Sequence, residues 1–217
     1  MVQSRDSAAQ YFLKLLRPNR AAEVDVLAYL SNIDSPDNHT VRLVAFRTCD
    51  LGTLILLPYA GIPLCDYGDI PAHLVSIASQ FLEGVAFLHE HKVAHCDLKT
   101  SNVVVDRDTG RITLIDFDLA ARGIDWLGGF SGTEGWTAPK VGNAPRYNAM
   151  RADVWAAGKV LYTIAVACPE SGDRQFLIPL SEGMMATDPN MRPSMMQVVE
   201  KFKRYVKGRA ESVLPAA

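Results

Sequence analysis

The chain has 217 residues, 48% of them hydrophobic, which is enough to bury one substantial core, and the length permits one or two domains. Its formal net charge of −2 gives no electrostatic reason to bind nucleic acid or an anionic membrane, so we expect neither partner. The four cysteines lie far apart without CxxC spacing, which argues against a zinc ribbon and a disulfide framework and favours free thiols in a reducing compartment.

The sequence shows no targeting or membrane signal. No stretch reaches the roughly 18 uninterrupted apolar residues that a spanning helix needs. The first ten residues, MVQSRDSAAQ, contain no apolar signal core. We therefore expect a soluble, cytoplasmic protein that is a monomer.

The N-terminal quarter predicts a small sheet with one helix. An aromatic and apolar run at 11–16 precedes the breaker RPN and is typical of a strand. Residues 23–30 carry apolar side chains at the spacing of a helix face. After the polar loop SNIDSPDNH, residues 41–46 and 53–57 predict two strands separated by a turn at Gly52.

The remaining sequence favours helices. The periodicity of residues 71–91 predicts a long amphipathic helix. Residues 103–105 and 112–115, joined by DRDTG, predict a hairpin. Residues 152–167 are apolar nearly all round, which indicates a buried helix, and residues 195–205 predict one more amphipathic helix.

The stretch 93–118, VAHCDLKTSNVVVDRDTGRITLIDFD, carries the residues that a phosphate-transferring site needs. Asp97 is followed by Asn102, and Asp116 comes at the end of an apolar run. Phosphoryl transfer needs a base to orient a hydroxyl and cations to neutralise phosphate oxygens. Mg²⁺ prefers hard oxygen ligands, usually one or two carboxylates together with substrate phosphates. Lys99 adds a positive charge close to Asp97.

At these residues the chain resembles the eukaryotic protein kinases, and the lysine at position 99 resembles the serine/threonine type. The resemblance extends over most of the chain and follows the order of the family's motifs. The matching positions are Lys14, Glu23 with Leu27, His95, Cys96, Asp97, Leu98, Lys99 and Asn102, the triplet 116–118, the segment 132–140, Asp153 with Trp155 and Gly158, and Asp188, Pro189, Arg192 and Pro193.

The resemblance implies an α+β fold with two lobes. It predicts a truncated N-lobe of about three strands and one helix, and a mainly α-helical C-lobe. We expect a single protein-kinase-like domain over 1–217, with a partial N-lobe at about 1–60, a C-lobe at 61–208 and a frayed tail at 209–217.

The family's catalytic and metal-binding roles fall on four residues of this sequence. By resemblance, Asp97 orients the acceptor hydroxyl and Lys99 stabilises the transferred charge. Asn102 and Asp116 are the implied Mg²⁺ ligands.

Two further residues have supporting roles in the family. Asp153 accepts hydrogen bonds from the catalytic-loop backbone, and Thr133 contacts the base and the lysine. An unpaired carboxylate at Asp153 would be expensive in such an apolar helix, so it needs buried donors.

The resemblance also implies an ATP site. Lys14, positioned by Glu23, would bind the ATP phosphates. The positions implied to face the adenine are Leu57, Pro58, Tyr59, Ala60 and Val104. Pro58 lacks the N–H donor that another residue would supply in that hinge.

The nucleotide site departs from the family pattern. No glycine-rich loop precedes Lys14, and Phe12 replaces a small alanine above the adenine ring. Asp118 replaces the glycine after Phe117, where glycine would tolerate φ > 0 more readily.

Three further departures concern regulation and substrate docking. Cys96 replaces the arginine that meets an activation-loop phosphate. Lys140 replaces the glutamate that pairs with Arg192, which predicts a like-charge contact. The stretch 168–176 is too short for the usual substrate-docking helix.

The resemblance therefore implies an ATP- and Mg²⁺-dependent kinase that transfers the γ-phosphate to Ser or Thr hydroxyls of a protein substrate. Two alternatives stay open. One is a pseudokinase that acts as a binding or scaffold protein for a partner, as the missing glycine-rich loop and Phe12 suggest. The other is a small-molecule phosphotransferase, which shares the HxDxxxxN loop.

Overall fold

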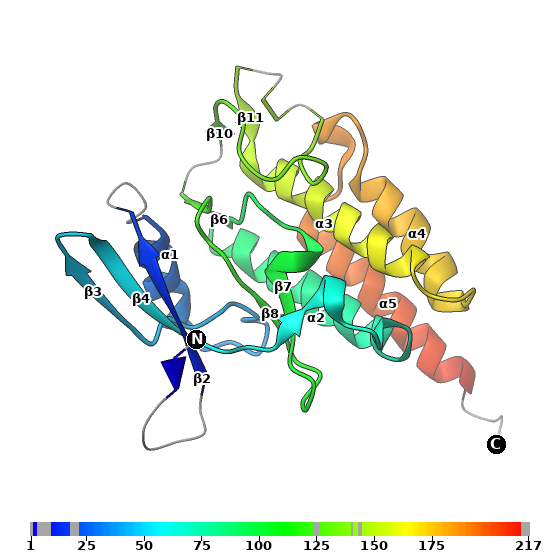
Figure 1. Cartoon of the computed structure of the whole chain (residues 1–217). Coiled ribbons are helices and arrows are strands. Elements are labelled where there is room, and N and C mark those ends of the chain that lie inside the picture. The colour runs from blue at the N-terminus through cyan, green and yellow to red at the C-terminus, as the bar shows by residue number, and fades with distance from the viewer. Residues whose placement is uncertain are drawn as a thin grey trace.

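The computed structural model describes residues 2–3, 10–17, 22–123, 126–139, 141–142 and 145–213. A small antiparallel sheet with one helix forms the N-terminal part, and helices dominate the C-terminal part (Figure 1). This arrangement confirms the predicted α+β fold with its reduced N-terminal sheet.

The N-terminal sheet has four strands in the order β1-β2-β4-β3. They are β1 (Val2–Gln3), β2 (Gln10–Leu16), β3 (Ala45–Cys49) and β4 (Gly52–Pro58). Side chains alternate between the two faces of a strand, so Lys14 shares a face with Leu16, which is buried. Lys14 pairs with Ile55 of β4, which is also fully buried. The strand therefore directs Lys14 toward the interior of the molecule.

The strand predicted at 41–46 is largely wrong. The strand β3 begins only at Ala45 and continues to Cys49, and Val44 just before it donates to the Leu56 carbonyl at 2.9 Å. Val41 instead donates its amide N–H to the Leu114 carbonyl at 2.9 Å, and Leu114 donates to the His39 carbonyl at 2.6 Å. These backbone hydrogen bonds attach this segment to the C-terminal part. The conformation of the segment is therefore decided by these tertiary contacts and not by the strand propensity of its own residues.

The helix α1 (Ala22–Ser31) confirms the predicted helix at 23–30. Leu27 and Leu30 are fully buried, in line with the apolar spacing. Glu23 lies in the first turn of α1 and is also buried, at 2% exposure. A buried carboxylate needs a partner, which the functional site supplies.

The C-terminal part is built from four long helices, with short strands between them. The helices are α2 (Ile70–Glu90), α3 (Ala149–Val166), α4 (Gly172–Met184) and α5 (Met195–Val213). The short strands are β5 (Ile62–Pro63), β6 (Val93–Ala94), β7 (Val103–Val105), β8 (Ile112–Leu114), β9 (Ala121–Arg122), β10 (Trp126–Leu127) and β11 (Tyr147–Asn148). The predicted hairpin is confirmed as the antiparallel pair β7–β8.

The C-terminal helix continues beyond its predicted end. Residues 209–213 belong to α5, so the fraying expected after Gly208 is wrong for them. The ring of Tyr205 stacks on Phe176 of α4 with centroids 3.9 Å apart, and Arg209 pairs with Asp173 at 3.3 Å. These contacts hold the last turns of α5 against α4.

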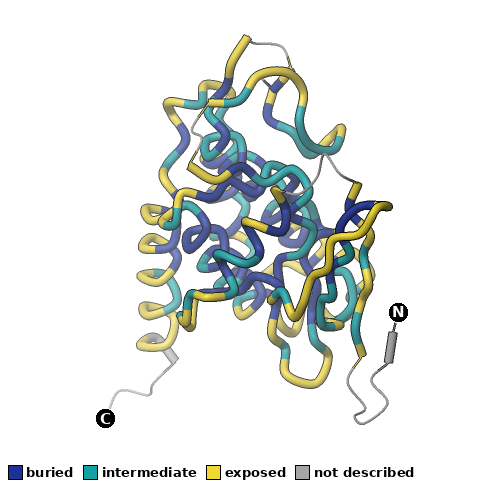
Figure 2. Tube along the Cα trace, turned by 90° about the vertical axis from the view of Figure 1, so that its left-hand side faces the viewer, coloured by how far each residue is buried: buried dark blue, intermediate teal, exposed yellow. Residues whose placement is uncertain are grey.

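The core runs without interruption from the sheet to the C-terminal helices. Figure 2 shows the buried residues concentrated inside the helical part, with exposed residues along the outer faces of the helices. Phe81 of α2 and Phe202 of α5 are among the largest fully buried side chains, and Leu27 and Ile55 join the same cluster from the N-terminal part. The two parts are therefore packed through shared apolar contacts.

One described helix, α2, has the length and composition of a membrane span. It contains 21 residues with a mean hydropathy of 1.2 over its most apolar window, and 50% of that window is buried inside the fold. Core helices pass the same test, and the buried side chains of α2 pack in the shared core.

Close approach of α3 and α4 at Gly158 gives a stability prediction. A Cβ at Gly158 would lie 2.8 Å from the Met184 Cβ and 2.8 Å from the Ser181 carbonyl oxygen. We expect Gly158→Ala to lower the free energy of unfolding by about 1–3 kcal/mol through overpacking, measured by urea denaturation. In the control Gly183→Ala, the new methyl group meets nothing within 4 Å. That variant should be unchanged or slightly more stable. Equal stability of the two variants would contradict the packing argument.

Candidate functional site

The loop after α2 is held by one buried carboxylate. Asp153 of α3, 1% exposed, accepts the amide N–H of His95 at 2.6 Å and that of Cys96 at 2.8 Å. Its Oδ2 also lies 3.3 Å from His89 Nε2. The hydrogen bonds expected between Asp153 and this loop are present. They impose the turn in which Cys96 adopts φ +64°, a conformation uncommon outside glycine.

His95 links the loop to the strand that follows it. Its Nδ1 accepts the amide N–H of Asp97 at 3.3 Å, so the neutral ring carries its proton on Nε2 and donates to the Ile115 carbonyl at 3.0 Å. The ring packs on Phe117, with centroids 4.8 Å apart. Both side chains are buried, and together they connect the loop of Asp97 to the segment that contains Asp116.

Asp97 lies at the centre of the first cluster of polar side chains. Its Oδ2 accepts from Lys99 Nζ at 2.7 Å and from Asn102 Nδ2 at 3.1 Å. Its Oδ1 accepts from Thr133 Oγ1 at 2.7 Å, and Lys99 also reaches Thr133 at 2.8 Å. The predicted contacts of Thr133 with the aspartate and the lysine are confirmed. Asp97 is thus a carboxylate of fixed orientation, 9% exposed and bound by three side-chain donors.

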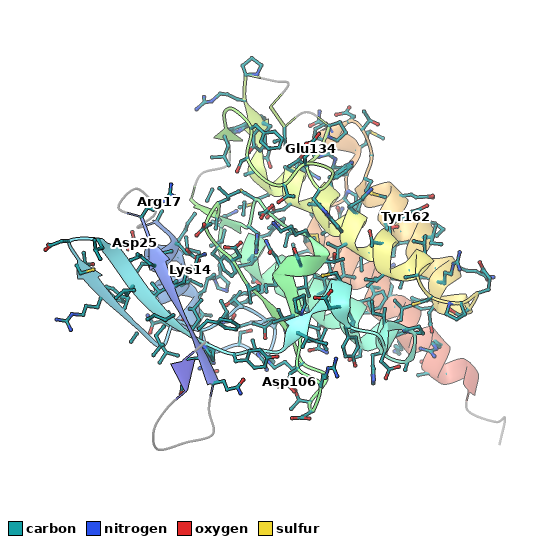
Figure 3. The ribbon with its side chains drawn as sticks, viewed as in Figure 1. Lys14, Arg17, Asp25, Asp106, Glu134 and Tyr162 are labelled. Atoms are coloured by element: carbon teal, nitrogen blue, oxygen red, sulfur yellow. The ribbon has the colours of Figure 1, made fainter. Side chains whose placement is uncertain are left out.

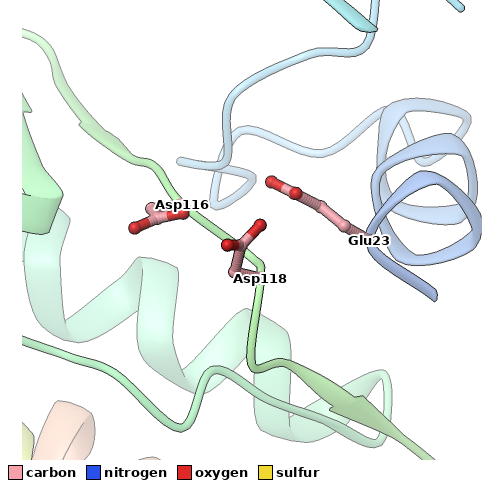
Figure 4. A group of neighbouring side chains, drawn as sticks. All are labelled: Glu23, Asp116 and Asp118. Carbon is pink, nitrogen blue, oxygen red and sulfur yellow. The ribbon is translucent and has the colours of Figure 1, made fainter. Parts of the chain in front are cut away.

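Lys14 lies at the centre of a second cluster. Its Nζ is 3.0 Å from Glu23 Oε1, 2.8 Å from Asp116 Oδ1 and 2.8 Å from Asp118 Oδ1. The expected Lys14–Glu23 pair is present in spite of the short connection between the two residues. Figure 3 shows Lys14 on β2 beside the helical part, and Figure 4 shows Glu23 extending from α1 toward the two aspartates. An ammonium group has three N–H donors, and all three are engaged.

The charges in this cluster shift the pKa values of its members. Burial alone would lower the pKa of Lys14, but the hydrogen bonds to Asp116 and Asp118 and the charges of Asp116 and Glu23 outweigh it and raise that pKa. Burial, and secondly the neighbouring Asp118 carboxyl, raise the pKa of Glu23 from 4.5 to about 7, against the opposing effect of Lys14. Glu23 therefore holds its proton to a higher pH in the folded protein than in the unfolded chain.

The two implied metal ligands lie in different clusters. Asp116 contacts Lys14, whereas Asn102 donates to Asp97 through Nδ2, which leaves its Oδ1 as the atom for a cation. The backbone joins them, because the Ile115 amide donates to the Asn102 carbonyl at 3.0 Å. Asp116 itself has φ +66°. The structure thus brings Asp116 next to Lys14 and Asn102 next to Asp97.

The residues implied to face adenine lie along β4 and β7. Leu57 pairs with Phe12, and the rings of Phe12 and Tyr59 have centroids 5.8 Å apart. Pro58 ends β4, and Ala60 follows in the connection to β5. Val104 is 5% exposed and pairs with Thr113 and Pro63. Phe12 therefore lies on the edge of this region, as a large ring in place of the family's small residue.

Asp118 is the member of the site that sequence reasoning did not assign. The family pattern marks it only as a replacement for glycine, although a carboxylate two residues from Asp116 indicates a second acid at the same place.

The predicted contact of Lys140 with Arg192 lies outside the described residues. Arg192 is buried and donates to the carbonyls of Ala186 and Arg151, each at 2.8 Å. Burial, and secondly Arg151, lower the pKa of Arg192 to about 10.

A comparison with protein families covers the cluster around Asp97 together with Asp116 and Asp118. Residues 69–176 match the family model described as a protein kinase domain. The chain is 35% identical over 140 residues to human mitogen-activated protein kinase kinase kinase 19, covering 57% of this chain and 10% of the relative. It is 30% identical over 142 residues to putative serine/threonine-protein kinase A of Trypanosoma brucei brucei, with coverage of 52% and 32%.

A third relative is the SNF1-like protein kinase ssp2 of Schizosaccharomyces pombe, 29% identical over 147 residues. The alignment covers 64% of this chain and 25% of that relative. The chain thus spans between about a tenth and a third of the length of these three curated proteins.

The role of Asp153 is tested by removing its acceptor atoms. Asp153→Ala leaves the buried amides of His95 and Cys96 without a partner, and each such group costs about 1–3 kcal/mol. We expect Asp153→Ala to lose at least about 2 kcal/mol of unfolding free energy and Asp153→Asn, which keeps one acceptor oxygen, to lose less. The control Asp108→Ala removes an exposed carboxylate. If the alanine variants at 153 and 108 denature alike, the loop does not depend on Asp153.

The raised pKa of Glu23 predicts how stability changes with pH. The folded protein retains a proton that the unfolded chain releases, so this contribution to stability is complete below pH 4.5 and is lost as the pH rises to about 7. Glu23→Gln cannot ionise at this position. Between pH 4.5 and about 7, the unfolding free energy of the unmodified protein should therefore fall relative to that of Glu23→Gln, and above pH 7 the difference between the two should stay constant. Denaturation at several pH values measures the difference. Parallel curves for the two proteins would refute the prediction.

Proposed function

Because the chain belongs to the eukaryotic protein kinase family, we propose that it transfers the γ-phosphate of ATP to a Ser or Thr hydroxyl of a protein substrate. The observation that carries this proposal is the geometry of Asp97, whose carboxylate is held by Lys99, Asn102 and Thr133. We further propose that this activity resides in a single domain spanning 1–217 and that the protein acts as a monomer in the cytoplasm.

Asp97 is arranged to hold an acceptor hydroxyl. Three donors restrict the carboxylate to one orientation, and a preorganised acceptor contributes to phosphoryl transfer mainly by positioning. Lys99 lies beside Asp97 with 19% of its side chain exposed, so its ammonium can face both the carboxylate and an incoming phosphoryl group. Thr133 connects both residues to the segment on which a substrate peptide would lie.

The donor set fits a hard divalent cation and a polyphosphate. Asp116 supplies a carboxylate oxygen and Asn102 an amide oxygen, the ligand types that Mg²⁺ prefers. When bound, the cation would neutralise charge on the phosphate oxygens. Lys14 would bind those phosphates after exchanging at least one of its carboxylate partners, since all three of its donors are engaged. The adenine would lie between Val104 and the segment 57–60.

One observation favours the pseudokinase alternative, in which the chain binds a partner without catalysis. Phe12 and Tyr59 lie 5.8 Å apart at the implied adenine site, and both rings are partly exposed. The adenine of ATP would have to displace these rings or pack against them in order to bind. The third alternative, a small-molecule phosphotransferase, has no support from the matches, whose names are those of protein kinases.

Substitution of Asp97 tests catalysis separately from nucleotide binding. We expect Asp97→Asn to reduce phosphate transfer from ATP to a generic protein acceptor such as casein by at least about 100-fold, the size of a general-base contribution. The rise in melting temperature with Mg²⁺ and millimolar ATP should be unchanged. Phosphoamino-acid analysis of the product identifies the acceptor hydroxyl.

The control for this experiment is Asp108→Asn, an exposed carboxylate outside both clusters. It should leave transfer and nucleotide binding unchanged. If the unmodified protein shows neither an ATP-dependent shift nor phosphate transfer, the kinase proposal fails and the pseudokinase alternative takes its place.

A further inference from the structure

We propose that Asp118, together with Glu23 and Asp116, forms a site that binds a hard divalent cation of the Mg²⁺ class in the absence of nucleotide. The proposal goes beyond phosphoryl transfer, because a chain that binds no ATP could still hold a cation here. It assigns a ligand role to an aspartate that stands where related kinases have glycine.

The three carboxylates already have the spacing of a metal site. One ligand oxygen from each of Glu23, Asp116 and Asp118 lies within 4.8 Å of the others. Around an octahedral ion with metal–oxygen distances of about 2.1 Å, neighbouring oxygens are about 3 Å apart and opposite ones about 4.2 Å. The carboxylates therefore need only small movements to share one ion.

A second observation, independent of the clustering, indicates a missing ligand. When Glu23 is ionised, its buried Oε2 has no donor among the described residues, because the Asp118 carboxyl next to it is itself an acceptor, and the side chain of Glu23 is 1% exposed. Its carboxylate is directed at the two aspartates (Figure 4). A buried oxygen that lacks a donor is costly, and coordination of a cation would remove that cost.

The site is open enough for a hydrated ion to enter. The side chains of Asp116 and Asp118 are 38% and 34% exposed, whereas Glu23 closes the inner side. Mg²⁺ sheds its waters reluctantly and usually keeps several of them. A shell of three carboxylates on one side and water on the other suits that behaviour.

Lys14 occupies the position that the cation would take. Its ammonium lies 2.8 to 3.0 Å from one oxygen of each carboxylate, so it acts as an internal substitute for the ion. A divalent ion among the same oxygens would repel Lys14, whose flexible stem allows it to turn away. Cation binding would then free the Lys14 donors for nucleotide phosphates, and cation and lysine compete for one set of ligands.

The competition makes opposite predictions for two substitutions. We measure binding of Mn²⁺ alone, without nucleotide, from the loss of the EPR signal of the free ion at pH 8. Asp118→Asn keeps the shape of the side chain and removes one charged ligand, so it should weaken Mn²⁺ binding by about tenfold or more. Lys14→Met removes the competing ammonium and should strengthen binding several-fold. Mg²⁺ should displace the bound Mn²⁺ in the unmodified protein.

The control is Glu182→Gln, which removes an exposed carboxylate on α4 and should leave Mn²⁺ binding unchanged. Thermal melting without metal verifies that each variant is folded. The proposal is overturned if the unmodified protein leaves millimolar Mn²⁺ free, if Asp118→Asn binds as tightly as the unmodified protein, or if Lys14→Met binds more weakly. A protein that binds Mn²⁺ alone but shows neither an ATP-dependent shift nor phosphate transfer would refute the proposed kinase activity and leave this site intact.

Discussion

The carboxylate of Asp153 is the interaction on which the arrangement of the catalytic loop depends. It lies inside an apolar helix and is satisfied by the backbone N–H groups of His95 and Cys96, at 2.6 and 2.8 Å. Neither the carboxylate nor the two amides would be stable in the interior alone, because a buried charge without donors and buried amides without an acceptor are both costly. The pair therefore holds the loop against α3 and compensates for the unusual φ of +64° at Cys96. Asp97 follows directly, so these backbone hydrogen bonds fix the position of its backbone, and the side chains of Lys99, Asn102 and Thr133 then orient its carboxylate.

The two clusters differ in how their partly buried charges are balanced. At Asp97, one carboxylate is matched by donors from Lys99, Asn102 and Thr133, and its geometry is determined. At Lys14, one ammonium is shared by the three carboxylates of Glu23, Asp116 and Asp118, and one buried oxygen of Glu23 has no described partner. The first cluster has both carboxylate oxygens of Asp97 matched by donors, whereas the second would gain from the cation that we propose to bind there. Of the described site, the Lys14 cluster is thus the part whose contacts have to change when a ligand binds.

Sequence periodicity predicted those elements whose burial pattern is local. The helix α2 shows a clear period of 3.6, α3 is a long apolar run, and β7 and β8 are short apolar runs joined by a turn sequence. The sequence predicts all of them within a few residues. The helix α4 was missed, because it is polar overall and contains Pro179. The segment at 41–44 is not a sheet strand, because Val41 bonds to Leu114, far away in sequence, and Leu43 donates to the Ser31 hydroxyl. In the site, the family motif indicated Asp97, Lys99 and Thr133, but the contact of Asp118 with Lys14 joins residues 104 apart and depends on the backbone turn at Asp116.

The departures at Cys96 and Asp118 have different consequences for control of the protein. Burial, and then the charge of Asp153, raise the pKa of the Cys96 thiol, so this position is neutral and offers no cation to an activation-loop phosphate. The loop is nevertheless held by Asp153 and His95, and a phosphate is not required to order it. Asp118 adds a carboxylate next to Lys14, where the phosphates of a nucleotide would bind. All three donors of Lys14 are engaged, so under the proposed function at least one of them would exchange its carboxylate partner for a phosphate oxygen.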